Sequence, residues 1–483
     1  MMILLNYIYL NKIGLRLTKH INHSVGKNIL LRLIKPSVLS ILMIVIFSVC
    51  TYKYWLAWPD HPFHNDVDQY YSYLVAYFIH HDFSFQFTHQ YWLTEAPNHQ
   101  LVPKVTMGLS FLYFPFFIIA NQIAHVFNYD GLGYSAPYAT CIHFGTLFYS
   151  ITGLWYCRKS LLIFFNEWVT ALTVLLILFG TNLFFYVYRE GEMSHSYLFF
   201  LFSIFMYHAL KWHDNYKSKH LYVMAFVLGF VTLIRPTDVL IFLIPLLYNV
   251  TNVKDLKTKF LLFISLKWRL LILLGIFMAP ILPQLIFWKI HTGQFLFFSY
   301  GSNEGFFFTD PKIYSVLFGW RKGWFIYTPI MIFAVIGLFL MFKKWKNMFF
   351  PIFIYLCFNI YIISSWWDWG FGGSHGMRAL VQSYAFLVFP LAFFINWIFN
   401  LSKNWLKFIL IPSCFSLFGF FIYLNMFQVW LFKNSLMHWD SMTRNAYVYA
   451  VFKTNWTKSE RVFLETLFKN PNYEELRKGK RDE

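Results

Sequence analysis

The chain has 483 residues, of which 58% are hydrophobic and only 13% are charged, with a formal net charge of +18. Soluble domains carry about 25% charged residues, so this composition excludes an ordinary water-soluble globular protein. The excess of Lys and Arg does not indicate nucleic-acid binding, because these residues cluster in short loops between apolar runs, where they fix the orientation of a membrane protein. The five cysteines stand singly in or beside apolar runs and imply no disulfide framework.

Apolar runs of about 18–25 residues recur along the chain, and this is the length of a transmembrane helix. The sequence therefore predicts an all-α, polytopic membrane protein with about 11–13 transmembrane helices. We expect three regions: a basic, cytoplasmic amphipathic segment over residues 1–36, a transmembrane domain over residues 37–430, and a small polar appendage over residues 431–483. The last residues of the appendage, 477–483, are expected to be frayed.

The first apolar run, residues 37–58, follows basic residues, so its start is predicted to be cytoplasmic and its end external. Loop 59–104 is then external, and its aromatic stretches 70–80 and 83–92 are predicted to be helices lying in the membrane interface. The next run, 105–127, starts on the external side, yet the basic loops that follow require the next span to start on that side too. We expect Pro115 to divide it into a re-entrant pair, because proline removes a backbone donor.

Two half-length apolar runs, 221–234 and 236–250, are separated by the polar residues 235–238, which begin with Arg235 and Pro236. A charge at membrane depth costs about 2.5–3.5 kcal/mol on insertion scales. Broken helices are tolerated only where they line a cavity or contact other protein. This break is therefore predicted to border a cavity, together with the other external polar loops, 189–194, 301–322 and 366–378.

Carboxylates stand in two of the predicted external segments, loop 59–104 and loop 189–194. Asp66 and Asp68 open the first loop, and a sugar transfer without a covalent intermediate needs one carboxylate to take a proton from the acceptor. Their alternative role is to cap the helix that follows. Glu190 and Glu192, with His195 nearby, precede a span; with Asp68 they are candidate ligands of a divalent ion such as Mg²⁺ or Mn²⁺, or they only complement the helix dipole.

Cationic side chains in the same loops are candidates for binding a phosphate: Arg235, Arg321, Lys322 and Arg378. Alternatively, Arg235 pairs internally with Asp66 or Asp238, and the loop 301–322 cations anchor the protein at the head-group level. Loop 366–378 contains four glycines that let backbone amides approach an anion. Its Trp367, Asp368 and His375, with Glu190 and His195, are candidate sugar or acceptor contacts.

The order of these motifs resembles the GT-C class of integral-membrane glycosyltransferases. The matching segments are 66–71 in the first external loop, Pro103-Lys104, Glu192-Met193, 233–237 with its Arg-Pro break, 318–329 and 372–380. Members of this class use polyprenyl-phosphate-linked sugars at the non-cytoplasmic face. The resemblance implies that Asp66 is the catalytic base and that Lys104 belongs to the donor phosphate site. Val67 stands where relatives often have a second acid, which leaves the role of Asp68 open.

The resulting hypothesis is an inverting glycosyltransferase of the bacterial inner membrane, with a cytoplasmic N-terminus and an external or periplasmic active site. Its partners would be a polyprenyl-phosphate sugar donor, membrane lipids, and a lipid, glycan or protein acceptor. Asp66 would be the general base, and Asp68 and Glu192 are further catalytic candidates. Two alternatives stay open: a transporter or flippase of lipid-linked substrates, and an oligosaccharyltransferase-like enzyme. The sequence does not reveal the sugar or the acceptor.

Overall fold

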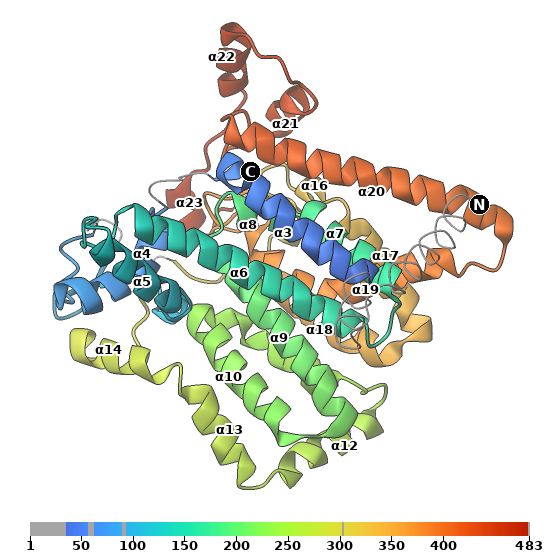
Figure 1. Cartoon of the computed structure of the whole chain (residues 1–483), viewed down its shortest axis with the longest axis horizontal. Helices are drawn as coiled ribbons and strands as arrows, with labels where there is room; N and C mark the ends of the chain where they lie inside the picture. The colour runs from blue at the N-terminus through green and yellow to red at the C-terminus, as the bar shows by residue number, and fades with distance from the viewer. Residues whose placement is uncertain (1–34, 57–61, 89–92, 302–303, 482–483) are drawn as a thin grey trace, which may run out of the picture.

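The computed structural model describes residues 35–56, 62–88, 93–301 and 304–481 (Figure 1). The predicted N-terminal basic segment, residues 1–36, lies outside the described residues apart from its last two positions. The fold is all-α, as predicted. The regular strands in the described ranges are short, β1 (Leu93–Glu95) and β2 (Leu101–Pro103), and they pair antiparallel within the first long loop.

The helices of the first half of the chain include several that are too short to cross a bilayer. They are α3 (Pro36–Trp55), α4 (Asp66–Val75), the π-helix η2 (Ala76–His80), α5 (Gly108–Val126), α6 (Ala136–Leu161), α7 (Glu167–Phe179), α8 (Leu183–Tyr188), α9 (Ser194–Asn215), α10 (Ser218–Ile234), the 3₁₀-helix η4 (Pro236–Phe242) and α11 (Leu243–Leu247).

The second half of the chain alternates long apolar helices with short ones in the connecting loops. Its helices are α12 (Val253–Ser265), α13 (Arg269–Met278), α14 (Leu282–Thr292), α15 (Ile313–Phe318), α16 (Trp324–Tyr327), α17 (Met331–Lys344), α18 (Lys346–Ser365), the 3₁₀-helix η5 (Arg378–Ser383), α19 (Tyr384–Phe399), α20 (Asn404–Lys433), α21 (Arg444–Ala450), α22 (Lys458–Thr466) and α23 (Tyr473–Arg477).

The apolar helices are those of a multi-pass membrane protein. Among the described residues, five helical segments are long and apolar enough to cross a membrane: α3, α5, α18, η5 with α19, and α20. α12 and α13, which are bent by 85°, add a sixth if they count as one span. The predicted number of about 11–13 spans is not reached by this measure, because several predicted runs are broken. Run 168–188, for example, is divided between α7 and α8 at residues 180–182.

Three local expectations can be compared directly with the structure. The break at Arg235 is confirmed: α10 ends at Ile234, and Arg235 has extended dihedrals (φ −143°, ψ 104°), as a residue before proline favours. The re-entrant pair at Pro115 is wrong, because α5 continues through this residue as one helix. The predicted interfacial helix over residues 83–92 is also wrong over 83–88, the part that the structure describes. The Asp82 side chain accepts hydrogen bonds from both N and Oγ of Ser84 (2.8 and 2.6 Å), forming a turn after η2.

The centre of the bundle is formed by η5 and α19, in which every residue from 379 to 392 is buried. α17 packs along α19, α6 along α9, and α3 along α7. α20 packs against α19 and α7 and lies at the outer edge of the bundle in Figure 1, and its Phe408 is 82% exposed. The central position of η5 places Arg378, its first residue, at the end of the bundle where the polar loops meet.

The C-terminal appendage follows α20 and returns to the same end of the bundle. Asp440 accepts hydrogen bonds from Arg321, and Arg481 donates to the backbone oxygens of Ser364 and Trp366 (3.0 and 2.9 Å). Arg481 is only 1% exposed. The prediction that residues 477–483 are frayed is therefore wrong up to residue 481, because the Arg481 side chain is buried and bonded to the backbone at the end of α18.

Candidate functional site

A cavity of about 450 Å³ opens where the predicted external loops meet. It is lined by seven segments that are far apart in the sequence: 66–70, 104–105, 193–195, 234–237, 298–306, 362–378 and 473. Seven of the candidate residues line it: Asp66, Lys104, His195, Arg235, Trp367, Asp368 and Arg378. The prediction that the carboxylate and cations of distant loops share one site agrees with this arrangement.

Asp66 faces Arg378 in this cavity. Asp66 is the first residue of α4 and Arg378 is the first residue of η5, and Asp66 Oδ2 lies 3.9 Å from Arg378 Nη1. The carboxylate side chain is 38% exposed and the guanidinium 17%. Arg378 also donates to the backbone oxygen of Gly373 (3.3 Å), which orients its guanidinium from within the glycine-rich loop. The long separation leaves Asp66 accessible to a ligand.

Arg235 contributes a second positive charge from the helix break. Its side chain makes no ion pair with a described residue, and its buried Nη1 has no hydrogen-bond partner there. Its guanidinium carbon lies 5.8 Å from the ring centre of Phe371. The alternative pairing with Asp238 is not formed, because Asp238 instead accepts hydrogen bonds from Gln382 Nε2 (3.0 and 3.3 Å). A half-buried guanidinium with one buried, unpartnered nitrogen is a favourable place for an anion.

Lys104 lines the cavity and forms an ion pair with Glu304, which was not among the site candidates from the sequence. Lys104 Nζ lies 2.7 Å from Glu304 Oε2 and 4.8 Å from the ring centre of Tyr300. Glu304 also pairs with Arg477 of α23 (3.5 Å). The charge of Lys104 is therefore already compensated, and the pair links the first loop to the C-terminal appendage.

Tyr300 stands among the charged groups of the cavity. Although it is 38% exposed, surrounding protein raises the pKa of its hydroxyl to about 12, and the charge of Asp66 adds to the rise. The charges of Arg235 and Arg378 lower this pKa, and Glu304 raises it further. Two carboxylates and two guanidinium groups thus affect the pKa of this one hydroxyl, so the four charges lie close to each other.

Apolar side chains cover the remaining cavity wall, and they come from several segments that reach towards the bundle: Val105, Ile234, Phe298, Phe306, Ile362, Ile363 and Phe371. The cavity therefore combines an acid, cations and an extended apolar surface. Buried polar atoms without a partner in the described chain also border it, on His195 (Nδ1) and Trp367 (Nε1). Such a wall accommodates a ligand with a charged head, polar groups and a hydrocarbon part.

Asp68 does not line the cavity, although it is only two residues from Asp66. Successive positions on a helix point about 100° apart, so two residues differ by about 200°. Asp68 is 5% exposed, and its Oδ1 accepts a hydrogen bond from the hydroxyl of Tyr134 (3.2 Å). This buried environment suits a structural role for Asp68.

Glu190 and Glu192 also lie outside the cavity lining. The Glu192 carboxylate is hydrogen-bonded to Nδ1 of His143, and both side chains are buried. Burial raises the pKa of Glu190 to about 7, while the charges of Arg189, Arg378 and Lys322 oppose the rise. Among the described residues, no three His, Cys, Asp or Glu side chains form a metal-type group, so Asp68, Glu190 and Glu192 do not form one ligand set.

Arg321 and Lys322 are buried beneath the glycine-rich loop. Arg321 Nη2 lies 2.7 Å from Asp440 Oδ1 and 3.2 Å from Asp368 Oδ1. Lys322 Nζ donates to the backbone oxygens of Ser374 (2.5 Å) and Trp439. Burial lowers the pKa of Lys322 to about 7. These two cations therefore support the loop that carries Arg378 and do not contact the cavity.

His375 and Asp368 support the loop from within. The His375 ring stacks on Phe185 at 5.0 Å, and burial lowers its pKa to about 3, so the imidazole is neutral. Asp368 lines the cavity, but its oxygens accept hydrogen bonds from Arg321 and from the amides of Gly370 and Gly372 (3.2, 3.2 and 2.6 Å). His375 does not line the cavity, and both carboxylate oxygens of Asp368 already accept hydrogen bonds.

Several cavity residues were not site candidates in the sequence, and they include the polar side chains of Tyr300, Glu304 and Tyr473. Glu304 had a usable signal, since it is an acid in an external loop. Tyr473 had none, because it reaches the cavity only through the docking of the appendage. Comparison of the sequence with protein-family models finds no match, and no curated protein is found to be similar.

Proposed function

We propose that the protein is a glycosyltransferase of the GT-C type, which moves a sugar from a polyprenyl-phosphate carrier to an acceptor at the external face of a bacterial inner membrane. The observation that carries this proposal is the 3.9 Å pair of Asp66 and Arg378 in a cavity that also contains Arg235, whose Nη1 has no hydrogen-bond partner among the described residues. The proposal requires an accessible carboxylate, a phosphate-binding cation and an apolar surface in one place.

The charges around the cavity favour a donor with one negative charge at its phosphate. Glu304 is shared by Lys104 and Arg477, and Arg321 is shared by Asp368 and Asp440, so these three cations and three carboxylates balance. Asp66 and Arg378 form a long pair, while Arg235 has no carboxylate partner among the described residues. A single uncompensated positive charge matches a sugar phosphodiester better than a diphosphate, because a further buried negative charge would be unpaired.

In the proposed reaction, Asp66 takes the proton from an acceptor hydroxyl as its oxygen attacks the anomeric carbon of the donor. The new bond forms on the face opposite to the leaving group, so the configuration is inverted. The bond between the anomeric carbon and the phosphate oxygen breaks, and its electron pair stays with the polyprenyl phosphate. Arg235 and Arg378 stabilise the developing negative charge, which is usually the largest catalytic contribution.

The experiment that tests the reaction class uses the purified chain in proteoliposomes with a radiolabelled polyprenyl-phosphate sugar. A transferase moves the label to a non-lipid or second-lipid product, and the carrier phosphate is released unglycosylated. A transporter or flippase moves the intact labelled lipid between leaflets and forms no product. Label that changes leaflet while remaining entirely on the original carrier would contradict the proposed function.

A further inference from the structure

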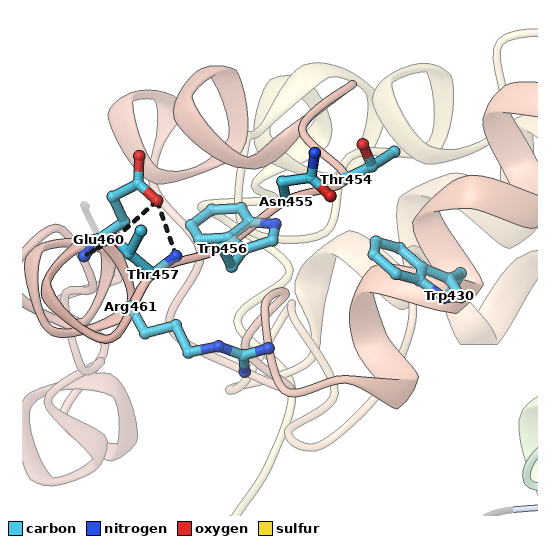
Figure 2. A pocket seen from close by; sticks show the side chains of 7 residues that line it. All are labelled: Trp430, Thr454, Asn455, Trp456, Thr457, Glu460 and Arg461. Atoms are coloured by element: carbon cyan, nitrogen blue, oxygen red, sulfur yellow. Dashed lines mark hydrogen bonds between the residues drawn. The ribbon is translucent and has the colours of Figure 1, made fainter.

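A second cavity lies in the C-terminal appendage, apart from the first. Its volume is about 620 Å³, within the range of about 300–1,000 Å³ that is usual for small-ligand sites. It is lined by Trp430 of α20, Thr454, Asn455, Trp456 and Thr457 of the loop between α21 and α22, and Glu460 and Arg461 of α22 (Figure 2). None of these residues was selected from the sequence.

The walls of this cavity are two indole rings. Figure 2 shows Trp456 and Trp430 on different sides, with Asn455 and Thr454 along the loop between them. Trp456 is fixed by its own contacts: its Nε1 donates to the backbone oxygen of Lys453 (3.0 Å), and its ring contacts Tyr449 edge-on (5.8 Å). Trp430 stacks on Phe427 at 5.4 Å. The two rings are therefore held in place before any ligand binds.

The polar groups of the cavity are of two kinds. The Glu460 carboxylate is occupied: it accepts hydrogen bonds from Lys453 Nζ (2.6 Å) and from N and Oγ1 of Thr457 (both 2.8 Å). The exposed side chains of Thr454 and Asn455 make no hydrogen bond within the described part of the chain. Arg461 is also exposed, and only its Nη1 contacts a backbone oxygen, that of Asn434 (3.4 Å). Hydroxyl, amide and guanidinium groups are thus available to a ligand.

The balance of charge indicates what kind of ligand fits. Hydrogen bonds from Lys453 and then from Thr457 lower the pKa of Glu460 to about 2, so a carboxylate charge stands in the wall at neutral pH. Lys453 compensates this charge at 2.6 Å, and the exposed Arg461 leaves the rim unfavourable for a cation. A neutral polyol needs no counter-charge here and can accept hydrogen bonds from Arg461. Aromatic faces combined with a few hydrogen-bonding side chains suit a sugar ring, whose C–H faces are apolar and whose edge is hydroxylated.

We propose that this cavity binds a neutral sugar unit of a glycan, with Trp430 and Trp456 stacking on the ring and Asn455 and Arg461 bonding its hydroxyls. The site lies at the same end of the bundle as the Asp66 cavity, since Lys433 at the end of α20 contacts Tyr54, and Asp440 pairs with Arg321. The proposal concerns binding only and does not depend on sugar transfer at the first cavity.

Saturation-transfer difference NMR on the full chain in detergent tests this site. The chain has 19 tryptophans, so intrinsic fluorescence would not report on two of them. The probes are maltotriose, mannotriose and chitotriose at millimolar concentration. We expect saturation transfer to at least one trisaccharide, and a reduction of about fivefold or more in Asn455→Ala and in Trp430→Ala. Asn455 is exposed, so its removal does not disturb the core.

The matched control is Trp405→Ala, which removes a 60% exposed tryptophan from the other end of the same helix and should leave the signal unchanged. The proposal is overturned if no trisaccharide gives a signal with the folded wild-type chain. It is also overturned if the signal persists in Asn455→Ala and Trp430→Ala but disappears in Arg235→Ala, since the sugar would then occupy the first cavity. Loss of signal in Trp405→Ala to the same extent would equally contradict it.

Discussion

Oδ2 of Asp66 lies 3.9 Å from Nη1 of Arg378, although the two residues come from opposite halves of the chain. Each begins a helix at the same end of the bundle, α4 for the aspartate and η5 for the arginine. The separation is longer than a hydrogen bond, so the pair is loose. A loose acid–cation pair in a cavity leaves both groups available to a substrate.

The first prediction concerns the geometry of the Arg235 guanidinium. Arg235→Lys keeps the positive charge but loses the planar fork that binds a phosphate by two hydrogen bonds. We expect the turnover of sugar transfer to fall about 10–100-fold in Arg235→Lys and about 100–1,000-fold in Arg235→Ala. Initial rates at saturating donor measure this difference. Equal activity of the wild type and Arg235→Ala would remove Arg235 from the phosphate site.

The second prediction concerns the appendage at the rim of the cavity. Arg477 pairs with Glu304, and its guanidinium lies 4.9 Å from the ring centre of Trp367. Because the arginine is 41% exposed, we expect Arg477→Ala to raise KM about two- to fivefold and to leave kcat nearly unchanged. The matched control is Lys478→Ala, which removes a neighbouring cation whose one ion pair in the described ranges is with Glu475. Identical kinetics of the two variants would show that the appendage does not shape the site.

The third prediction separates a structural acid from a catalytic one. The side chains of His143 and Glu192 are 2% and 6% exposed, and removal of one partner from a buried pair costs about 3–5 kcal/mol. Glu192→Ala should therefore lower the unfolding temperature in detergent, while transfer per folded molecule is retained. Glu95→Ala is the matched control, because its pair with His99 is exposed (61% and 88%) and should hardly affect stability. A fully stable but inactive Glu192→Ala would restore a catalytic role.

The fourth prediction follows from the pKa of Glu190, which burial raises from 4.5 to about 7. The folded chain holds this proton more tightly than the unfolded chain, so the associated stability is fully present below pH 4.5 and is lost as the pH rises through about 7. We expect the unfolding temperature of the wild type to decrease over this window, and the decrease to be smaller in Glu190→Gln. Parallel pH profiles of the two proteins would exclude this assignment.

The part of the site that depends on neighbouring residues in the chain could be predicted from the sequence. Proline after Arg235 ends α10, and a charged break in an apolar helix borders a cavity, as the structure has it. The same reasoning failed at Pro115, where α5 continues as one helix. Asp68 looked equivalent to Asp66 in the sequence, but helical rotation turns it towards Tyr134.

Long-range docking could not be derived from local patterns. Glu304 meets Lys104 and Arg477 only when three distant segments fold together. The appendage looked polar and peripheral, yet Tyr473 lines the cavity and Arg481 is buried. Such contacts carry no periodicity or spacing that a single sequence displays. The all-α class and the apolar helices were predictable, whereas the completed cavity required the structure.

The most direct test of the account is the initial rate of labelled-sugar transfer by Asp66→Asn, measured beside Asp68→Asn on the same helix. If Asp66 is the base, Asp66→Asn should lose about 10²–10⁴-fold in turnover while still binding the donor lipid. Asp68→Asn, which changes a buried contact to Tyr134, should retain transfer in its folded fraction. Wild-type turnover in Asp66→Asn would contradict the central claim.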